Sequence, residues 1–274
     1  VQRNPKRLKL LIYVLYSQQD SDEPEGRILQ LCEEYARLVP DDAFPWLISS
    51  SLYHERGVPN LAVRAYRETL QRALPVEEVH RVRMQLVQLE LLLGELKQAR
   101  EHCNALLQET RDPAALKMVT AMHAELLQRE GQPAEALALL DKLLAETPEW
   151  TKARALRGRC RFELQDYAGA VSDLSTAVRQ NEFDQQTHYV LAQAYRQLKE
   201  TARADVHFDR SRELSDIGAQ ILTLESQLRN DLYNRDLKLR LADLNDKLGD
   251  KEKAAAWRRG AQKLRYSEPL PVVP

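Results

Sequence analysis

Mostly apolar residues recur at helical spacing along the chain, and short breaks interrupt them. Between residues 112 and 150 the first stripe follows i, i+3, i+4 spacing and consists of Leu116, Val119, His123, Leu126 and Leu127. Gly131-Gln132-Pro133 then breaks the helix, and a second stripe runs from Ala136 to Leu144 until Thr147-Pro148 ends it. Because the turn between them is short, the pattern predicts two antiparallel helices.

This two-helix pattern repeats with a period of about 34 residues. A small residue recurs in the same phase at Ala62, Ala99, Ala136, Ala170, Ala204 and Ala254. Four residues later an apolar residue follows in five copies, Tyr66, Cys103, Leu140, Leu174 and Phe208, whereas the last copy has Arg258. The alanine lets a second helix approach closely, and the larger residue fills the space beside it. One hairpin cannot bury both of its faces, so the repeats predict a stacked array.

Three stretches carry further residues in a common phase. Residues 151–184 contain Gly158, Asp166, Tyr167, Ala170 and Ala177; residues 185–218 contain Leu191, Ala192, Tyr195, Ala204 and Phe208; and residues 43–76 contain Trp46, Tyr53, Gly57, Ala62 and Tyr66. These residues resemble the motif of the tetratricopeptide repeat family. The chain departs from that motif at Glu90, Arg161 and Asn245, which occupy a position where the family has tyrosine.

The resemblance implies an all-α fold, a right-handed α-solenoid of stacked antiparallel helix hairpins. We expect a single domain over residues 1–268 with about seven units, at 9–42, 43–76, 80–113, 117–150, 151–184, 185–218 and 235–268. A further apolar stripe of Ile217, Ile221, Leu224 and Leu228 predicts an extra helix over residues 217–231. The Pro-rich tail, residues 269–274, is expected to be a linker or frayed end, with a PxxP ligand as the alternative.

Composition and charge exclude several classes of protein. The 274 residues are 43% hydrophobic and 30% charged, which is unlike a disordered chain. Forty basic residues against forty-one acidic ones disfavour nucleic acid as the main partner. Cys32, Cys103 and Cys160 are far apart, so we expect buried reduced thiols and a cytoplasmic protein.

No motif points to catalysis. The chain has no phosphate loop, no GxSxG elbow and no HExxH helix. Its six histidines, at positions 54, 80, 102, 123, 188 and 207, include no i, i+4 pair. We therefore expect a protein that is not an enzyme and that holds no cofactor and no metal.

In the resembled family, the first helix of each pair lines the inner face of the solenoid. The corresponding positions in units two to four are mixed and partly apolar: Phe44, Leu47, Ser51, His54, Arg81, Met84, Gln88, Leu91, Met118, Ala121, Glu125 and Gln128. Units five and six gather basic, amide and aromatic residues instead. The predicted partner-binding residues are Lys152, Arg159, Gln186, Tyr189, Gln193 and Arg196, which suit an acidic peptide segment.

Two functions remain open. The favoured one is a non-catalytic scaffold that binds a peptide or partner surface in the concave groove. The alternative is a structural spacer or dimerisation module of a larger chain, in which case a homodimer is one outcome. The apolar run from Leu10 to Tyr16 is too short to span a bilayer. Because the chain begins at Val1 rather than Met, it could be a fragment of a protein with an upstream domain or membrane anchor.

Overall fold

The computed structural model describes residues 4–17, 25–55, 57–231 and 234–263. These residues form fourteen α-helices and no strand, which confirms the all-α prediction. The predicted Pro-rich tail, residues 269–274, lies outside the described residues. The chain divides into two compact units, residues 1–139 and residues 140–274, and the boundary falls inside helix α8. The single domain expected over residues 1–268 stays a prediction.

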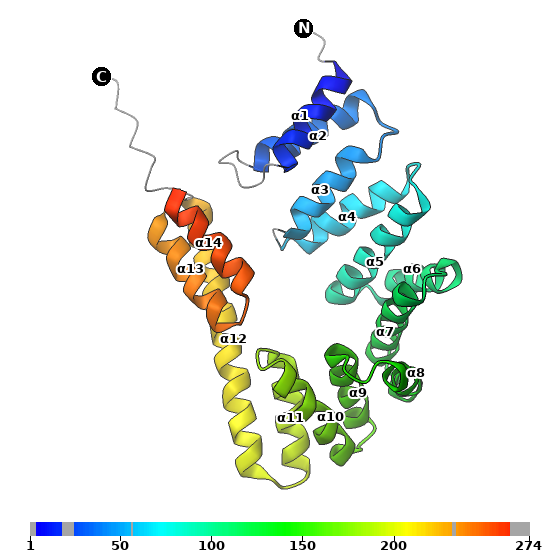
Figure 1. Ribbon diagram of the computed structural model, residues 1–274, viewed down its shortest axis with the longest axis vertical. Helices are drawn as coiled ribbons and strands as arrows, with labels where there is room; N and C mark the ends of the chain where they lie inside the picture. The colour runs from blue at the N-terminus through cyan, green and yellow to red at the C-terminus, as the bar shows by residue number, and fades with distance from the viewer. Residues whose placement is uncertain (1–3, 18–24, 56, 232–233, 264–274) are drawn as a thin grey trace. The chain divides into compact units, whose positions relative to one another are not determined.

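The first unit consists of α-helices that follow one another along the chain (Figure 1). They are α1 (Pro5–Ser17), α2 (Glu25–Leu38), α3 (Phe44–Glu55), α4 (Pro59–Leu70), α5 (Val76–Leu93), α6 (Leu96–Glu109), α7 (Pro113–Arg129) and the start of α8 (Pro133–Glu146). Gly94 ends α5 in the left-handed conformation, with φ 76°, and its N–H donates to the carbonyls of Glu90 and Leu91. Gly131, which the sequence predicts to break a helix, has the same left-handed conformation, with φ 78°, which residues with a side chain rarely adopt.

The second unit continues the same arrangement and contains the rest of α8. Its other helices are α9 (Thr151–Glu163), α10 (Tyr167–Gln180), α11 (Gln185–Gln197), α12 (Thr201–Asn230), α13 (Arg235–Lys247) and α14 (Lys251–Lys263). Several of them begin at an N-cap side chain. Asp166, Asp184 and Asn234 each accept a hydrogen bond from the backbone N–H three residues later. These caps satisfy donors that the first turn of a helix leaves unpaired.

The recurring alanines are buried in every copy, which confirms the phase of the repeat. They are between 0 and 2% exposed at Ala62, Ala99, Ala136, Ala170, Ala204 and Ala254. In the α9–α10 hairpin, Gly158 also permits a close approach. A Cβ atom added there would lie 2.6 Å from Cγ of Leu174, which is too near for any carbon contact. Small residues therefore set how closely the paired helices approach each other.

The extra helix expected over residues 217–231 is wrong as a separate element. Those residues are the second half of α12, one helix of 30 residues that starts at Thr201. No proline interrupts this segment, and Gly218 stays within the helix, where a Cβ atom would meet nothing within 4 Å. The predicted apolar stripe is nevertheless buried, because Ile217, Ile221, Leu224 and Leu228 pack against Leu241 and Leu244 of α13. The final hairpin thus packs on the C-terminal half of α12 (Figure 1).

Candidate functional site

Helix α9 carries five basic residues, and the fold divides them between two faces. Arg154, Arg157 and Arg161 lie three and four residues apart and therefore share one face. All three approach Asp173 of α10, which is 2% exposed. Arg157 binds its carboxylate with two hydrogen bonds of 2.8 and 2.7 Å, and Arg161 adds one of 2.9 Å. These arginines are engaged within the fold and are not available to a ligand.

The other two cations of α9 have no such acid. Lys152 and Arg159 are seven residues apart, about two helical turns, and share the opposite face. Neither makes an ion pair with a described residue. Lys152 is exposed, and the half-buried Arg159 has a buried Nε without any hydrogen-bond partner. Because neither cation has an acid within the described fold, both keep their capacity for a charge-assisted hydrogen bond to an acceptor from outside the chain.

Helix α11 contacts α9 directly and presents the other four predicted residues. Gln186, Tyr189 and Arg196 are exposed, and Gln193 is half-buried. Tyr189 and Arg196 both contact a further residue, Phe208 of α12. The ring of Tyr189 packs edge-on against it with centroids 5.9 Å apart, and the guanidinium of Arg196 lies 5.6 Å from its centroid. Phe208 is a member of this cluster that the sequence reading did not include, although its aromatic position in the repeat was recognised.

The predicted binding residues on these two helices carry charge of one sign only. The six predicted residues on α9 and α11 include three cations and no carboxylate. We call Lys152, Arg159, Gln186, Tyr189, Gln193 and Arg196 the α9–α11 surface. Its free cations, amides and exposed aromatic ring can bind a carboxylate by charge-assisted hydrogen bonds and an apolar side chain beside it.

In the first unit, the expected inner positions are not all accessible. Leu91 is 2% exposed and packs in the core with Val87, Ala99 and Cys103, so its assignment to a binding face was wrong. Met118, in contrast, is 46% exposed. Leu91 is buried because it lies in the last turn of α5, where this helix packs against α6 and α7.

A histidine pair on α11 and α12 could not be recognised from sequence spacing. His188 and His207 are 19 residues apart, yet their Nδ1 atoms are separated by only 2.9 Å, and the ring of Tyr195 stacks on His207. Burial lowers the pKa of both rings, and the neighbouring His188 lowers that of His207 further. One ring must donate and the other accept, so the pair requires that at least one of the two rings is unprotonated.

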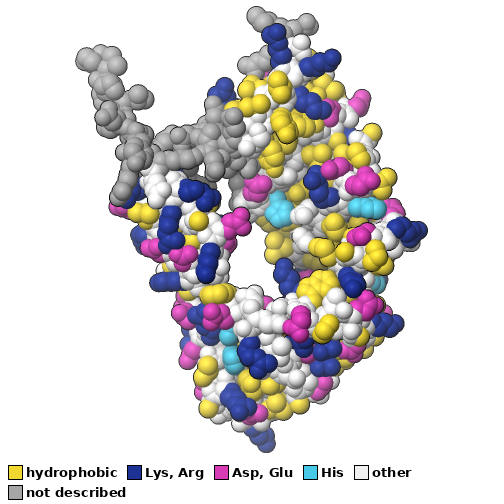
Figure 2. All heavy atoms as spheres, in the orientation of Figure 1, with side chains coloured by type: hydrophobic (Ala, Val, Ile, Leu, Met, Phe, Trp, Pro, Cys, Tyr) yellow, Lys and Arg dark blue, Asp and Glu magenta, His cyan; other side chains and the backbone are white. Residues whose placement is uncertain are grey.

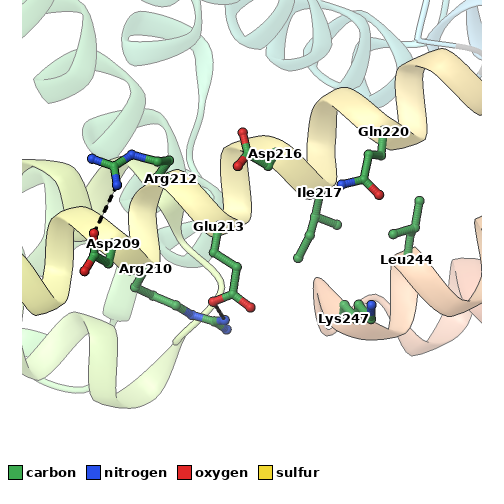
Figure 3. Close-up of a pocket in the computed structure, with 9 residues that line it drawn as sticks. All are labelled: Asp209, Arg210, Arg212, Glu213, Asp216, Ile217, Gln220, Leu244 and Lys247. Atoms are coloured by element: carbon green, nitrogen blue, oxygen red, sulfur yellow. Dashed lines mark hydrogen bonds and ion pairs between the residues drawn. The ribbon is translucent and has the colours of Figure 1, made fainter.

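A hollow of about 630 Å³ lies between α12 and the end of α13 (Figure 3). Seven of the nine residues around it come from α12, and its charges are mixed. Asp209 and Glu213 pair along the helix with Arg212 and Arg210 at 3.1 and 2.8 Å. Because these charges are already matched, the hollow has less capacity than the α9–α11 surface to attract a charged ligand.

The described residues contain no cluster of histidine, cysteine and carboxylate side chains suited to a metal ion. The three cysteines are buried, as expected, and burial raises the pKa of Cys32 and Cys103 to about 11 and that of Cys160 to about 12. Such thiols are unreactive near neutral pH. In the part of the chain that is described, no helix combines the length and apolar character needed to cross a bilayer.

Comparison with known proteins agrees with the repeat pattern. A family model for the tetratricopeptide repeat matches residues 121–184 and 161–210. A search of curated proteins found no match. Solved structures with a similar fold include a tetratricopeptide repeat protein from Parabacteroides merdae, which is 15% identical over 96% of this chain and 94% of its own, with a TM-score of 0.58.

Two further structures are similar. A chain of the APC/C hetero-tetramer Cut9-Hcn1 is 14% identical over 78% of this chain, with a TM-score of 0.57. The aligned part spans 44% of that chain, less than half of its length. The apo form of RapI is 15% identical over 81% of this chain and 97% of its own, with a TM-score of 0.53. At these identities the likeness concerns the fold.

Proposed function

Residues 121–210 belong to the tetratricopeptide repeat family, and from this premise we propose that the chain is a protein-interaction scaffold that binds an acidic peptide segment on the α9–α11 surface. One observation carries the proposal. Of the five cations on α9, three are engaged by Asp173, while Lys152 and Arg159 have no acidic partner among the described residues. A scaffold of this kind needs no catalytic group, because binding requires only hydrogen-bond donors held in fixed positions on rigid helices.

The composition of the surface indicates which ligand it would take. Arginine and lysine side chains bind carboxylates by hydrogen bonds that are about twice as strong as neutral ones. The exposed ring of Tyr189, supported by Phe208, offers a rigid aromatic contact of the kind that often dominates an interface. The expected ligand is therefore an extended or helical segment with two or more carboxylates next to an apolar residue.

Charge reversal tests this proposal directly. The variant Lys152→Glu/Arg159→Glu/Arg196→Glu removes the three cations of the surface. The matched control, Arg179→Glu/Arg212→Glu/Arg240→Glu, makes the same change of charge on exposed arginines of α10, α12 and α13. Both variants should keep the helical circular dichroism of the parent chain, since surface substitutions usually change stability by no more than about 0.5 kcal/mol each.

Binding is measured with an array of labelled peptides of acidic, neutral and basic composition, followed by affinity capture from native lysate. We expect acidic peptides with an apolar residue to bind, and the surface variant to weaken them by at least about 100-fold, which corresponds to about 2.7 kcal/mol. The control variant should retain most of the affinity. Equal loss in both variants would mean that net charge alone attracts the peptides. If the parent chain binds no acidic peptide and captures nothing, the spacer function is the better description.

A further inference from the structure

The first helix exposes an apolar face that the other described residues leave uncovered. The inner side of α1 is buried, with Leu8 and Ile12 at 4 and 0% exposure among residues of α2 and α3. On the outer side, Leu10 and Tyr13 are 63 and 59% exposed, and Leu11 and Val14 are 40 and 37% exposed. A helix at the surface of a fold normally turns its polar face to water. This helix is apolar on both sides, so its outer face requires a separate explanation.

The charges of α1 all have one sign. The helix contains Lys6, Arg7 and Lys9 and no acidic residue. Lys9 is engaged in the fold, because its ammonium group binds Asp42 at 2.6 Å and lies 4.8 Å from the ring centroid of Phe44. Lys6 and Arg7 are exposed and make no ion pair with any described residue. Two free cations therefore occupy the first turn, directly before the exposed apolar residues.

The helix geometry places the two features on the same side. Taking 100° per residue, Lys6, Arg7, Leu10, Tyr13 and Val14 fall within about 120° of one another, opposite the buried Leu8 and Ile12. In Figure 2 hydrophobic side chains gather over the N-terminal helices, with Lys and Arg side chains at the edge of that area. The outer face is thus cationic at one end and apolar along the rest.

We propose that the outer face of α1 binds the surface of an anionic lipid membrane, with Leu10, Tyr13 and Val14 in the interface and Lys6 and Arg7 at the lipid phosphates. Charge supports this choice, since a helix with free cations and no acid suits an anionic surface. Tyrosine is favoured at the membrane–water interface because its ring is apolar and its hydroxyl is polar. Binding of this kind lies along the surface and needs no spanning helix.

The small size of the face also favours a lipid surface over a second copy of the chain. A stable protein interface takes about 20–30 residues from each side. Helix α1 exposes seven residues in all, and three of these are Lys6, Arg7 and Ser17. A bilayer can cover so narrow a stripe completely, because it adapts to the shape of what it covers.

The test uses the full chain in a flotation assay with two kinds of vesicle, phosphatidylcholine alone and phosphatidylcholine with phosphatidylglycerol in equal parts. We expect the chain to float with the anionic vesicles at low salt, to float weakly with the neutral ones, and to bind less as salt is raised. The variants Lys6→Gln/Arg7→Gln and Leu10→Gln/Tyr13→Gln should each weaken binding by roughly ten-fold or more. These residues are exposed, so neither variant should change the circular dichroism.

A matched control is provided by Val206 and Leu222 of α12, which are 65 and 69% exposed. The variant Val206→Gln/Leu222→Gln removes a similar apolar area from another helix and should bind anionic vesicles like the parent chain. The proposal is overturned if the parent does not float with anionic vesicles, or if the α1 variants bind as well as the control. It is equally overturned if light scattering shows a vesicle-free dimer that the Leu10→Gln/Tyr13→Gln variant dissociates, since the face would then bind a second copy.

Discussion

Replacing Asp173 with asparagine should be among the most damaging single changes in the second unit. The carboxylate is 2% exposed and accepts three hydrogen bonds, two from Arg157 and one from Arg161. A third guanidinium, that of Arg154, lies 3.9 Å away. Asparagine has nearly the same shape but carries no charge, and its amide N–H₂ group would face guanidinium groups that can only donate. Three half-buried cations would then lose the buried anion that they share, and only the more exposed Asp141 and Asp166 would remain as partners of Arg157 and Arg161.

The magnitude follows from the contacts that are lost. Removing one partner of a buried ion pair costs about 3–5 kcal/mol, because the remaining charge stays buried without compensation. The three arginine side chains are only 19, 17 and 24% exposed, so solvent can screen them only in part. Since these arginine side chains can still rotate partly into water, we expect a loss of stability at the lower end of this range, about 3 kcal/mol.

Amide hydrogen exchange of peptides from residues 151–180 measures this loss where it occurs, which is preferable because repeat arrays need not unfold in one step. The α9–α10 amides should exchange about 100-fold faster in the Asp173→Asn variant, which corresponds to about 2.7 kcal/mol. As a control, Asp209 pairs with Arg212 on the surface, with side chains 73 and 70% exposed. Asp209→Asn should change the free energy of local opening, as measured by exchange, by less than about 0.5 kcal/mol. If Asp173→Asn behaves like this control, the arginines do not depend on Asp173 and the division of α9 into two faces is incorrect.

Three further changes test the packing. Gly158→Ala should lower the free energy of unfolding in urea by about 1–3 kcal/mol, because the overpacking outweighs a helix-propensity gain of about 1 kcal/mol. Gly218 has open space around it, so Gly218→Ala should stabilise the chain slightly. Ala170→Glu places a carboxylate at a fully buried position and should cost several kcal/mol, read as a lower thermal midpoint; an unchanged midpoint would contradict the repeat phase. The pKa values of His188 and His207 are lowered in the folded chain, so the contribution of the pair to stability is complete above about pH 6.5 and is lost as the pH falls further. The thermal unfolding midpoint should therefore drop between about pH 7.5 and 5.5. In the His207→Gln variant this drop should be smaller.

The parts of the fold that could be predicted are those with a local signal in the sequence. Alanine at the helix contact, a larger residue one turn later and a glycine or proline between the helices are all read within one hairpin, and the structure places them as expected. The length of α12 was not predicted, because nothing in the sequence marks where a helix continues beyond its usual length. The pair of His188 and His207 was also missed, since it depends on how α11 and α12 face each other.

The departures from the repeat motif illustrate the same limit. At the position where the family has tyrosine, Glu90 is fully buried and binds Arg67 of α4 at 2.8 Å. Asn245 is 3% exposed and donates to the carbonyl of Leu241. Arg161 binds Asp173. In each case a polar substitute has acquired a partner elsewhere in the fold, in two of them on another helix, and only the folded chain identifies that partner.

Ion pairs within the fold decide whether a basic residue in the sequence can be interpreted as a binding residue. Lys152, Arg154, Arg157, Arg159 and Arg161 form one basic helix when read as sequence, and a search for cations alone would treat them as equivalent. A cation whose carboxylate lies within the fold has already been compensated and offers little to a ligand, whereas one without such a carboxylate keeps its capacity for a charge-assisted hydrogen bond. The residues that merit mutation as binding residues are therefore the unpaired ones, Lys152 and Arg159, and the three arginines that surround Asp173 are the controls for stability.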